Sequence, residues 1–241
     1  MVCEALADRE TACTLADRVL VDAIDWLDDG MLDTQRRWQG RTSDEAFLRW
    51  ASVKDEADKA GLKGLFGHFG GRPGEPDALV ARRALMLFMT ADKVPDAVML
   101  IRDSDGDPRR RIGLEQARDN SAWPFHVVIG VAEPKRECWV LAGFDARENE
   151  VEALRAVEQR LSFHPVRDAH RLTAREHGAK NDAKKALDEL TSGKAERELE
   201  CLRDTPLEML QSRGAHVGLT QFLAEVRERL VPVVGGSKRH E

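Results

Sequence analysis

Three aspartates at alternate positions, Asp103, Asp105 and Asp107, follow the apolar run at residues 97–101. The run contains Val and Ile and ends in a cluster of Ser, Gly and Asp, which predicts a short buried strand that stops at the aspartates. Three carboxylates brought together repel one another, so the pattern favours a cation at this point. Mg²⁺, a hard cation that prefers oxygen ligands, suits such a site.

Two simpler interpretations account for parts of the same pattern. Asp-x-Asp-x-Asp begins a calcium-binding EF-hand loop, but Pro108 stands where that loop needs Gly and Leu114 where it needs Glu. The aspartates could instead form a solvated turn, with Asp107 as the N-cap and Pro108 as the first residue of the next helix. That turn explains Asp107 and leaves Asp103 and Asp105 without a role.

The composition is that of a globular, cytoplasmic protein. The chain has 241 residues, of which 42% are hydrophobic and 33% charged, and neither a membrane span nor a signal peptide is predicted. Its four cysteines are far apart and form no CxxC pair, which indicates reduced thiols and no zinc site. The net charge of -6 lies mostly in residues 1–150, so nucleic acid would have to be held by local basic patches or by a partner.

Strands and helices are predicted to alternate through the first part of the chain. Residues 1–3 read as a strand, and Glu4 then precedes a helix with Asp8 as its N-cap that continues to Leu27. A further strand is predicted at residues 125–132. The intervening and following segments are predicted as helices over 45–60, 77–92, 108–118 and from Pro134, with an irregular Gly-rich loop at 61–76. This alternation predicts a three-layer α/β sandwich around a small parallel sheet.

The last part of the chain is predicted to be helical. We expect an α/β domain over residues 1–145, a helical C-terminal extension over 146–234 and a disordered tail over 235–241. The helices of the extension are predicted at 150–161, 181–190, 195–203, 207–213 and 219–230.

Parallel strands end at the same edge of a sheet, so Glu4 should lie beside Asp103 and Asp105. This order, Glu after the first strand and Asp-x-Asp after a later one, resembles the Toprim domain of topoisomerases, primases and OLD-family nucleases. The likeness is greatest to small stand-alone bacterial Toprim-like proteins. The family has Gly after its Glu, where this chain has Ala5; Asp22 is the alternative to Glu4. The segments that carry the resemblance are 101–107, 127–132, 137–139, 180–184 and 218–223.

The resemblance implies metal-dependent hydrolysis of phosphodiester bonds in nucleic acid, DNA rather than RNA, as in a defence nuclease. It implies Mg²⁺ or Mn²⁺ held by the catalytic residues Glu4, Asp103 and Asp105, with Asp107 and Glu137 as further metal ligands. A tyrosine nucleophile is excluded because the chain contains no Tyr. The predicted contacts to nucleic acid are Arg102, Lys135, Arg136, Lys180 and Lys184.

Other functions remain open at this point. The chain could be a Toprim-like subunit of weak or no activity that binds nucleic acid or a partner ATPase, since it has no Walker motif of its own. It could also form a homo-oligomer. A phosphatase of the HAD type is disfavoured, because its Asp-x-Asp follows the first strand of the domain, whereas here the pair follows a later one.

Overall fold

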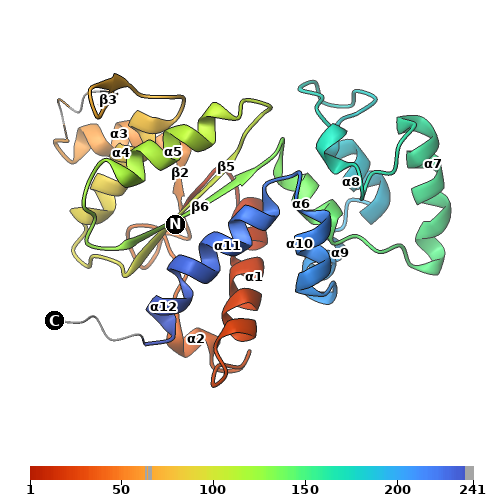
Figure 1. Cartoon of the computed structure of the whole chain (residues 1–241), viewed down its shortest axis with the longest axis horizontal. Helices are drawn as coiled ribbons and strands as arrows, with labels where there is room; N and C mark the ends of the chain where they lie inside the picture. The colour runs from red at the N-terminus through yellow and green to blue at the C-terminus, as the bar shows by residue number, and fades with distance from the viewer. Residues whose placement is uncertain (63, 65–66, 237–241) are drawn as a thin grey trace.

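A four-stranded parallel sheet forms the centre of the protein (Figure 1). The computed structural model describes residues 1–62, 64 and 67–236. The strands are β1 (Val2–Cys3), β2 (Leu48–Arg49), β5 (Ala97–Asp103) and β6 (His126–Ala132), in the order β2-β1-β5-β6. All neighbours pair in parallel, with Asp103 of β5 opposite Ala132 of β6. The prediction of an α/β fold with a small parallel sheet is confirmed.

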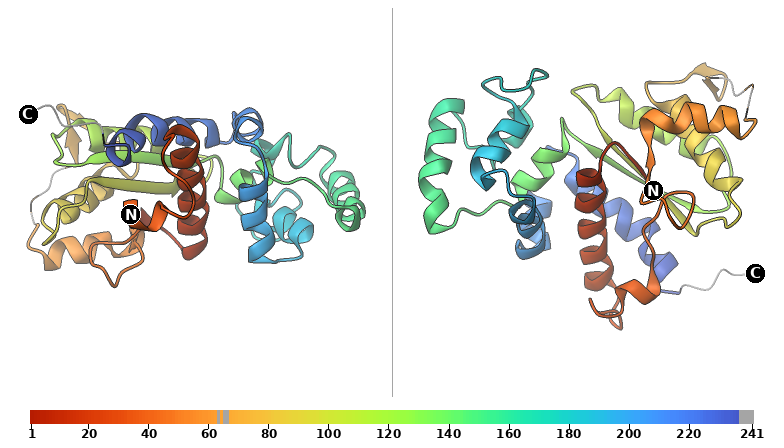
Figure 2. Two further views of the ribbon diagram at one scale, coloured as in Figure 1. Left: turned by 90° about the horizontal axis from the view of Figure 1, so that it is seen from below. Right: turned by 180° about the vertical axis from the view of Figure 1, so that it is seen from behind.

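Helices cover both faces of this sheet, as the two views of Figure 2 show. On one face lie α3 (Val53–Lys59), α4 (Ala78–Met89) and α5 (Arg109–Asp119), packed on the side chains of Val98, Leu100 and Ile129. On the other face lie α1 (Leu6–Ala23) and α11 (Leu219–Arg229), packed on Met99, Ile101 and Val128. Alternate strand residues point to opposite faces, so β5 and β6 are apolar on both sides.

The C-terminal half is helical, and part of it returns to the sheet. A group of helices stands beside the sheet: α6 (Arg136–Ala142), α7 (Val151–Leu161), α8 (Ala183–Thr191), α9 (Ala195–Asp204) and α10 (Leu207–Arg213). The chain then runs back, so that α11 packs on β6 and α12 (Val231–Val234) reaches α1. One hydrophobic core includes residues from both halves, and the domain boundary after residue 145 therefore stays a prediction. None of the described helices has the length and apolar character needed to cross a bilayer.

Two predicted segments differ from those observed. Residues 45–60 do not form one helix: β2 comes first, followed by a 3₁₀ turn at Trp50–Ser52 and then α3. Pairing with β1 thus overrides the helical periodicity of this segment. The Gly-rich loop holds a small antiparallel hairpin, β3 (His68–Phe69) and β4 (Arg72–Pro73). Gly70 and Gly71, at φ 56° and 80°, make its two-residue turn.

The limits of α1 and α5 also differ from prediction. α1 stops at Ala23 instead of Leu27, and α2 (Leu32–Gln35) follows in a segment for which no helix was predicted. Pro108 is the N-cap of α5, while Asp107 accepts a hydrogen bond from the amide of Arg109 at 3.1 Å. The predicted tail at 235–241 lies outside the described residues except for Gly235 and Gly236.

Gly130 in β6 allows two helices to pack closely on the sheet. The rings of Trp139 in α6 and Phe222 in α11 stack beside it, with centroids 4.9 Å apart. A Cβ at position 130 would lie 2.6 Å from Ile101 Cδ1 and 2.8 Å from Phe222 Cδ2, too close for either atom to stay in place. Glycine is therefore required for close approach, which is the usual reason for glycine within a strand.

We expect Gly130→Ala to lower the free energy of unfolding by about 1–3 kcal/mol, because the stacked rings cannot move without opening the core. Urea denaturation measures this loss. The matched control is Gly67→Ala, where an added Cβ meets only Leu79 Cδ2 at 3.9 Å. Its change should stay within about 0.5 kcal/mol, and equal losses in the two variants would contradict the packing argument.

Candidate functional site

The carboxyl edge of the sheet collects acidic side chains from three strands. Glu4 follows β1, Asp103 is the last residue of β5, and Glu133 follows β6. The chain beyond β5 stays against the end of β6, because Ser104 N donates to Ala132 O at 2.8 Å and Asp105 N to Pro134 O at 3.0 Å. The parallel topology thus brings the acids of separate segments to one edge.

Asp103 carries a partly buried carboxyl group that forms no ion pair with the residues that the structure describes. Its side chain accepts one hydrogen bond among the described residues, from the amide of Arg136 to Oδ1 at 2.9 Å. Burial, followed by the charges of Asp8, Glu137 and Glu4, raises the pKa of Asp103 to about 8, against the opposing effect of the Arg136 amide. Asp103 is therefore largely protonated near neutral pH, and it would lose its proton to a cation placed beside it.

Asp8 belongs to the same group of acids, although its sequence position suggested only a helix cap. The N-cap of α1 is Ala5, and Asp8 sits three residues later. Its Oδ2 accepts from the amides of Glu4 and Ala5, at 3.2 and 2.8 Å. Burial raises the pKa of Asp8 even though these amides and Arg136 oppose the shift. The signal available in the sequence was the spacing of four residues from Glu4, which places both at the start of one helix.

Arg136 connects the acids that come from three helices. Its Nη1 lies 2.8 Å from Glu198 Oε2 in α9, and its other nitrogens lie 3.9 Å from Asp8 and 3.7 Å from Glu137. Burial alone would lower the pKa of Arg136, but Glu137, Glu198 and Asp8 together raise it. Arg136, predicted as a contact to nucleic acid, has 11% of its side chain exposed.

The other two predicted catalytic acids are paired with arginines. Glu4 forms an ion pair with Arg102, and Asp105 lies 3.3 Å from Arg110. Both arginines also reach Asp77, at 3.0 and 3.5 Å, a partly buried acid for which the sequence gave no signal. Asp105 adopts φ 49°, and its side chain is 44% exposed, so it diverges from Asp103 even though the two are close in sequence.

Of the two remaining predicted metal ligands, Glu137 is near Asp103 and Asp107 is not. Glu137, 14% exposed, acts electrostatically on Asp103. Asp107 pairs with Arg109 at 2.8 Å on the outer side of the turn, and this arginine lowers the pKa of Asp107. Glu133 lies 3.5 Å from Arg111.

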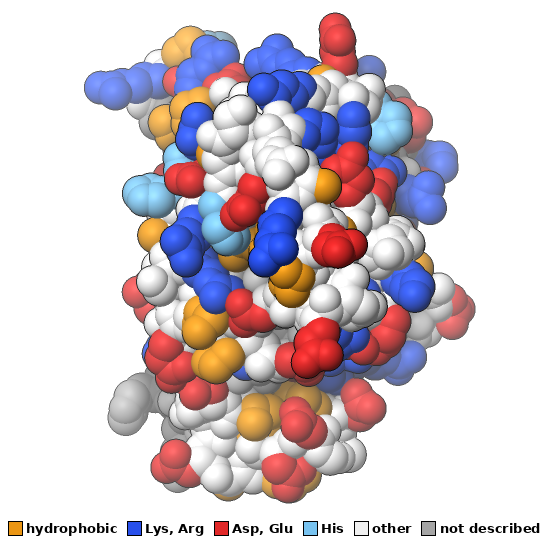
Figure 3. Space-filling model, turned by 90° about the vertical axis from the view of Figure 1, so that its right-hand side faces the viewer, with side chains coloured by type: hydrophobic (Ala, Val, Ile, Leu, Met, Phe, Trp, Pro, Cys, Tyr) orange, Lys and Arg blue, Asp and Glu red, His pale blue; other side chains and the backbone are white. Residues whose placement is uncertain are grey.

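A basic segment, residues 171–184, lies next to α6 at this edge. Asp182, almost fully buried, accepts the amides of Gly178 and Lys184 at 2.7 and 3.0 Å, and the charge of Lys135 at the start of α6 acts on it. Figure 3 views the side of the molecule where α7 and α8 lie. It shows Lys, Arg and His side chains gathered over the upper part of that side, with acids mostly below. The exposed basic residues of the segment are Arg171, Arg175, Lys180 and Lys184.

The acids at the edge match a divalent cation in donor type, since carboxylate oxygens are its preferred ligands. Within residues 1–62, 64 and 67–236, however, no three Asp, Glu, His or Cys side chains are arranged to hold a metal ion. Arginines contact Glu4, Asp105, Asp8 and Glu137, and they supply the positive charge that these acids need. Asp103 is the acid of this group whose carboxyl group has no arginine side chain as a partner in the described part of the chain, although Arg110 donates to its backbone carbonyl at 3.4 Å.

The shifted pKa of Asp103 predicts a dependence of stability on pH. The folded state holds its proton up to about 8, whereas the unfolded chain loses it near the ordinary value of 3.8. Stability should therefore fall as pH rises between these values. Asp103→Asn removes this loss, so we expect the stability of the variant relative to the wild type to rise across the window, by on the order of 1 kcal/mol per pH unit.

Urea denaturation at several pH values between about 5 and 8, with a chelator present, measures this difference. Asp92→Asn, at an exposed position beyond α4, is the control and should show no such trend. A stability difference for Asp103→Asn that does not change with pH would show that Asp103 ionises normally.

Searches against protein-family models, curated proteins and solved structures each found no match to this chain. The resemblance to Toprim proteins therefore stays a prediction that depends on the acids and the strand order.

Proposed function

We propose that the protein hydrolyses phosphodiester bonds of nucleic acid with a divalent cation, Mg²⁺ or Mn²⁺, bound at Asp103. The observation that carries this proposal is the state of Asp103: a carboxyl group at the carboxyl end of a central strand, surrounded by acids, with one backbone amide as its hydrogen-bond partner among the described residues. Perturbed acids at this edge of a parallel sheet favour a functional site over a structural one.

The residues of the edge have distinct parts in this proposal. Asp103 would give up its proton and serve as the central ligand. Asp8 and Glu137 are the acids whose charges act most strongly on it. Arg136 holds both of these acids and is anchored to α9 through Glu198. When bound, the cation would neutralise charge on the phosphate and activate a water molecule. Glu4 and Asp105 would join the site only by leaving Arg102 and Arg110.

Positive charge near the edge supports a nucleic-acid substrate. Arg102 and Arg110 line the edge itself, while Lys135 and the exposed Lys180 and Lys184 belong to the basic segment next to α6. Phosphate contacts of this type fix a strand in position without reading its sequence. The chain contains no Tyr, so a covalent tyrosine intermediate is excluded and attack by water is the route that we propose.

A second candidate function is a Toprim-like subunit that binds nucleic acid or a partner ATPase without cutting. The observation that favours it is the pairing of the acids with arginines, because an edge neutralised by Arg102, Arg110 and Arg136 needs no cation for its stability. The two functions differ in whether Asp103 takes up a metal ion and whether that ion supports cleavage.

Cleavage of supercoiled plasmid, linear DNA and single-stranded RNA by the full chain tests the first function. With Mg²⁺ or Mn²⁺ we expect hydrolysis that Asp103→Asn lowers at least about a hundredfold, since the variant keeps the shape of the side chain and loses its charge. Asp92→Asn, with the same chemical change at an exposed position, should retain full activity.

Calorimetric titration of Mn²⁺ into the same proteins separates the two functions. Metal binding and cleavage that are both lost in Asp103→Asn support the nuclease. Metal binding without cleavage of any of the three substrates contradicts it and supports the binding subunit. Cleavage that survives in Asp103→Asn would exclude Asp103 as the central ligand.

DNA binding to the basic segment predicts a change in salt dependence. We expect the double variant Lys180→Ala/Lys184→Ala to weaken binding of duplex DNA and to reduce the slope of log K against log salt by about 2, one for each lost phosphate contact. Fluorescence anisotropy over a range of NaCl concentrations measures the slope. The control is Lys54→Ala/Lys93→Ala, on exposed positions in and beyond the α3–α4 layer; an equal change there would show that only net charge matters.

A further inference from the structure

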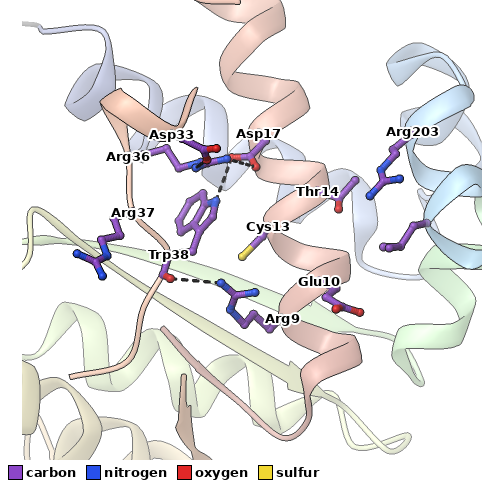
Figure 4. A pocket seen from close by; sticks show the side chains of 11 residues that line it. Arg9, Glu10, Cys13, Thr14, Asp17, Asp33, Arg36, Arg37, Trp38 and Arg203 are labelled. Carbon is purple, nitrogen blue, oxygen red and sulfur yellow. Dashed lines mark hydrogen bonds and ion pairs between the residues drawn. The ribbon is translucent and has the colours of Figure 1, made fainter. Parts of the chain in front are cut away.

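The open polar pocket between α1, the segment 33–38 and α9 is lined by side chains that bond to one another (Figure 4). Asp17 of α1 accepts from Arg36 Nε at 2.7 Å and from Trp38 Nε1 at 3.0 Å. Arg9, also in α1, donates to the carbonyl oxygen of Trp38 at 3.3 Å. These bonds attach the segment to α1, so the residues that form them have a structural role.

A pair of histidine rings beside α6 has no such bonds. The rings of His170 and His216 are in contact, with centroids 5.3 Å apart and planes inclined by 58°. Both residues are exposed, and neither side chain has a hydrogen bond or an ion pair with the residues that the structure describes. Their ring nitrogens are therefore available to a ligand from solvent, and imidazole nitrogens are the commonest metal ligands in proteins.

The backbone at the first histidine is held by α6. Cys138 Sγ donates to the carbonyl oxygen of Ala169 at 3.4 Å, and Ala169 is buried. It begins the 3₁₀ turn at 169–171, in which His170 is the next residue. The position from which the His170 side chain projects is therefore fixed by the core.

The backbone at the second histidine is held by the next residue of the same helix. Trp139 Nε1 donates to the carbonyl oxygen of Val217 at 2.7 Å, and Glu133 N donates to the same oxygen at 3.0 Å. Val217 is buried and directly follows His216 in the link between α10 and α11. Two fixed attachment points lower the cost of bringing both rings to one ligand.

The separation of the rings matches that of two imidazoles bound to one tetrahedral ion. With zinc–nitrogen bonds of about 2.0–2.1 Å, each ring centre lies about 3.2 Å from the ion, and a tetrahedral angle places the two centres about 5.2 Å apart. The right angle of a square-planar or octahedral ion would bring them to about 4.5 Å. The observed 5.3 Å favours Zn²⁺ over Cu²⁺ or Ni²⁺.

The nitrogens can turn toward such an ion without a change in this separation. The centre of a histidine ring lies close to the axis of its Cβ–Cγ bond, so rotation about that bond moves the nitrogens and leaves the centre nearly in place. The torsion about this bond is broad in histidine, and both rings are exposed. The distance between the rings is therefore a property of the backbone positions, whereas the tilt adjusts to the ligand.

The arginine nearest in sequence to each histidine has a partner of its own. The guanidinium of Arg171 lies 4.3 Å from the centre of the Phe163 ring, and Arg213 Nη2 lies 2.9 Å from Asp145. Neither guanidinium donates to an imidazole in the described part of the chain. The lone pairs of both histidines thus stay available to a metal ion.

The pair supplies two ligands to an ion, and solvent would supply the others. No group of three His, Cys, Asp or Glu side chains among the described residues is arranged to hold a metal ion, and all four cysteines are buried. Structural zinc sites have four protein ligands, so a site with two is open to water. Its affinity depends on chelation by both rings, and the loss of either ring should remove most of it.

We propose that His170 and His216 bind one Zn²⁺ ion, with water completing its tetrahedral coordination. The ion would join the start of the basic segment to the link between α10 and α11. This site is separate from the Asp103 edge and does not depend on the proposed nuclease function, because imidazole nitrogens suit Zn²⁺ whereas the carboxylates of the edge suit Mg²⁺ or Mn²⁺.

Calorimetric titration of Zn²⁺ into the full chain, with excess Mg²⁺ present to occupy carboxylate sites, tests the pair. We expect one ion per chain at this site. His170→Gln and His216→Gln should each weaken its binding at least about tenfold, because either variant leaves a single imidazole. His126→Gln makes the same change at an exposed position at the start of β6 and should bind zinc as the wild type does.

Co²⁺ in place of Zn²⁺ reports the geometry, because a tetrahedral cobalt site absorbs visible light far more strongly than hydrated, octahedral Co²⁺. The absorption should appear with the wild type, disappear when Zn²⁺ is added, and be absent from the double variant His170→Gln/His216→Gln. Asp103→Asn should show it unchanged, which distinguishes this site from the edge. The proposal is overturned if the double variant binds zinc as tightly as the wild type, if Asp103→Asn loses the site, or if the bound Co²⁺ is octahedral.

Discussion

The arrangement of acids at the carboxyl edge of the sheet depends on the contacts of Arg136, whose side chain is mostly buried. Its side chain reaches Glu198 in α9, Glu137 in its own helix and Asp8 in α1, while its amide donates to Asp103 at the end of β5. Acids so close together would repel one another without it. The same contacts attach the helices beside the sheet to its edge. Removing a buried charge of this kind leaves several acids unpaired, which costs far more than the pair itself contributes.

The strand order explains why the acids meet and why they are unequal. Glu4 and Asp103 end neighbouring parallel strands, so the sheet delivers them to one edge. Glu4 stays accessible and takes Arg102 as its partner, whereas Asp103 lies deeper and keeps a proton. Asp105, two residues later, lies in a turn where its backbone has a positive φ, and the chain turns away from the strand direction there. The alternation in sequence therefore does not produce three equivalent ligands. Of the three aspartates, Asp103 is the one whose carboxyl group is mostly buried and has no arginine side chain as a partner among the described residues.

Elements with strong apolar periodicity could be predicted from the sequence, and those decided by pairing could not. The strands at 97–103 and 126–132 and the helices at 151–161 and 219–229 were predicted within a few residues, because burial on one or two faces leaves a clear pattern. The two-residue β2 was read as helix, since only its partner β1 makes it a strand. At the site, Glu137 was predicted near Asp103. Asp77 could not be, since its two arginine partners come from distant segments.

Two helices that are far apart in the sequence meet at Arg136. Asp8 and Thr11 of α1 face Arg136, and Glu198 of α9 pairs with it. Because Arg136 also lies near Glu137 and its amide donates to Asp103, a displacement of α9 relative to α1 would change the contacts of Arg136 with the acids at the edge of the sheet. The position of α9 is therefore part of what sets the electrostatic surroundings of Asp103.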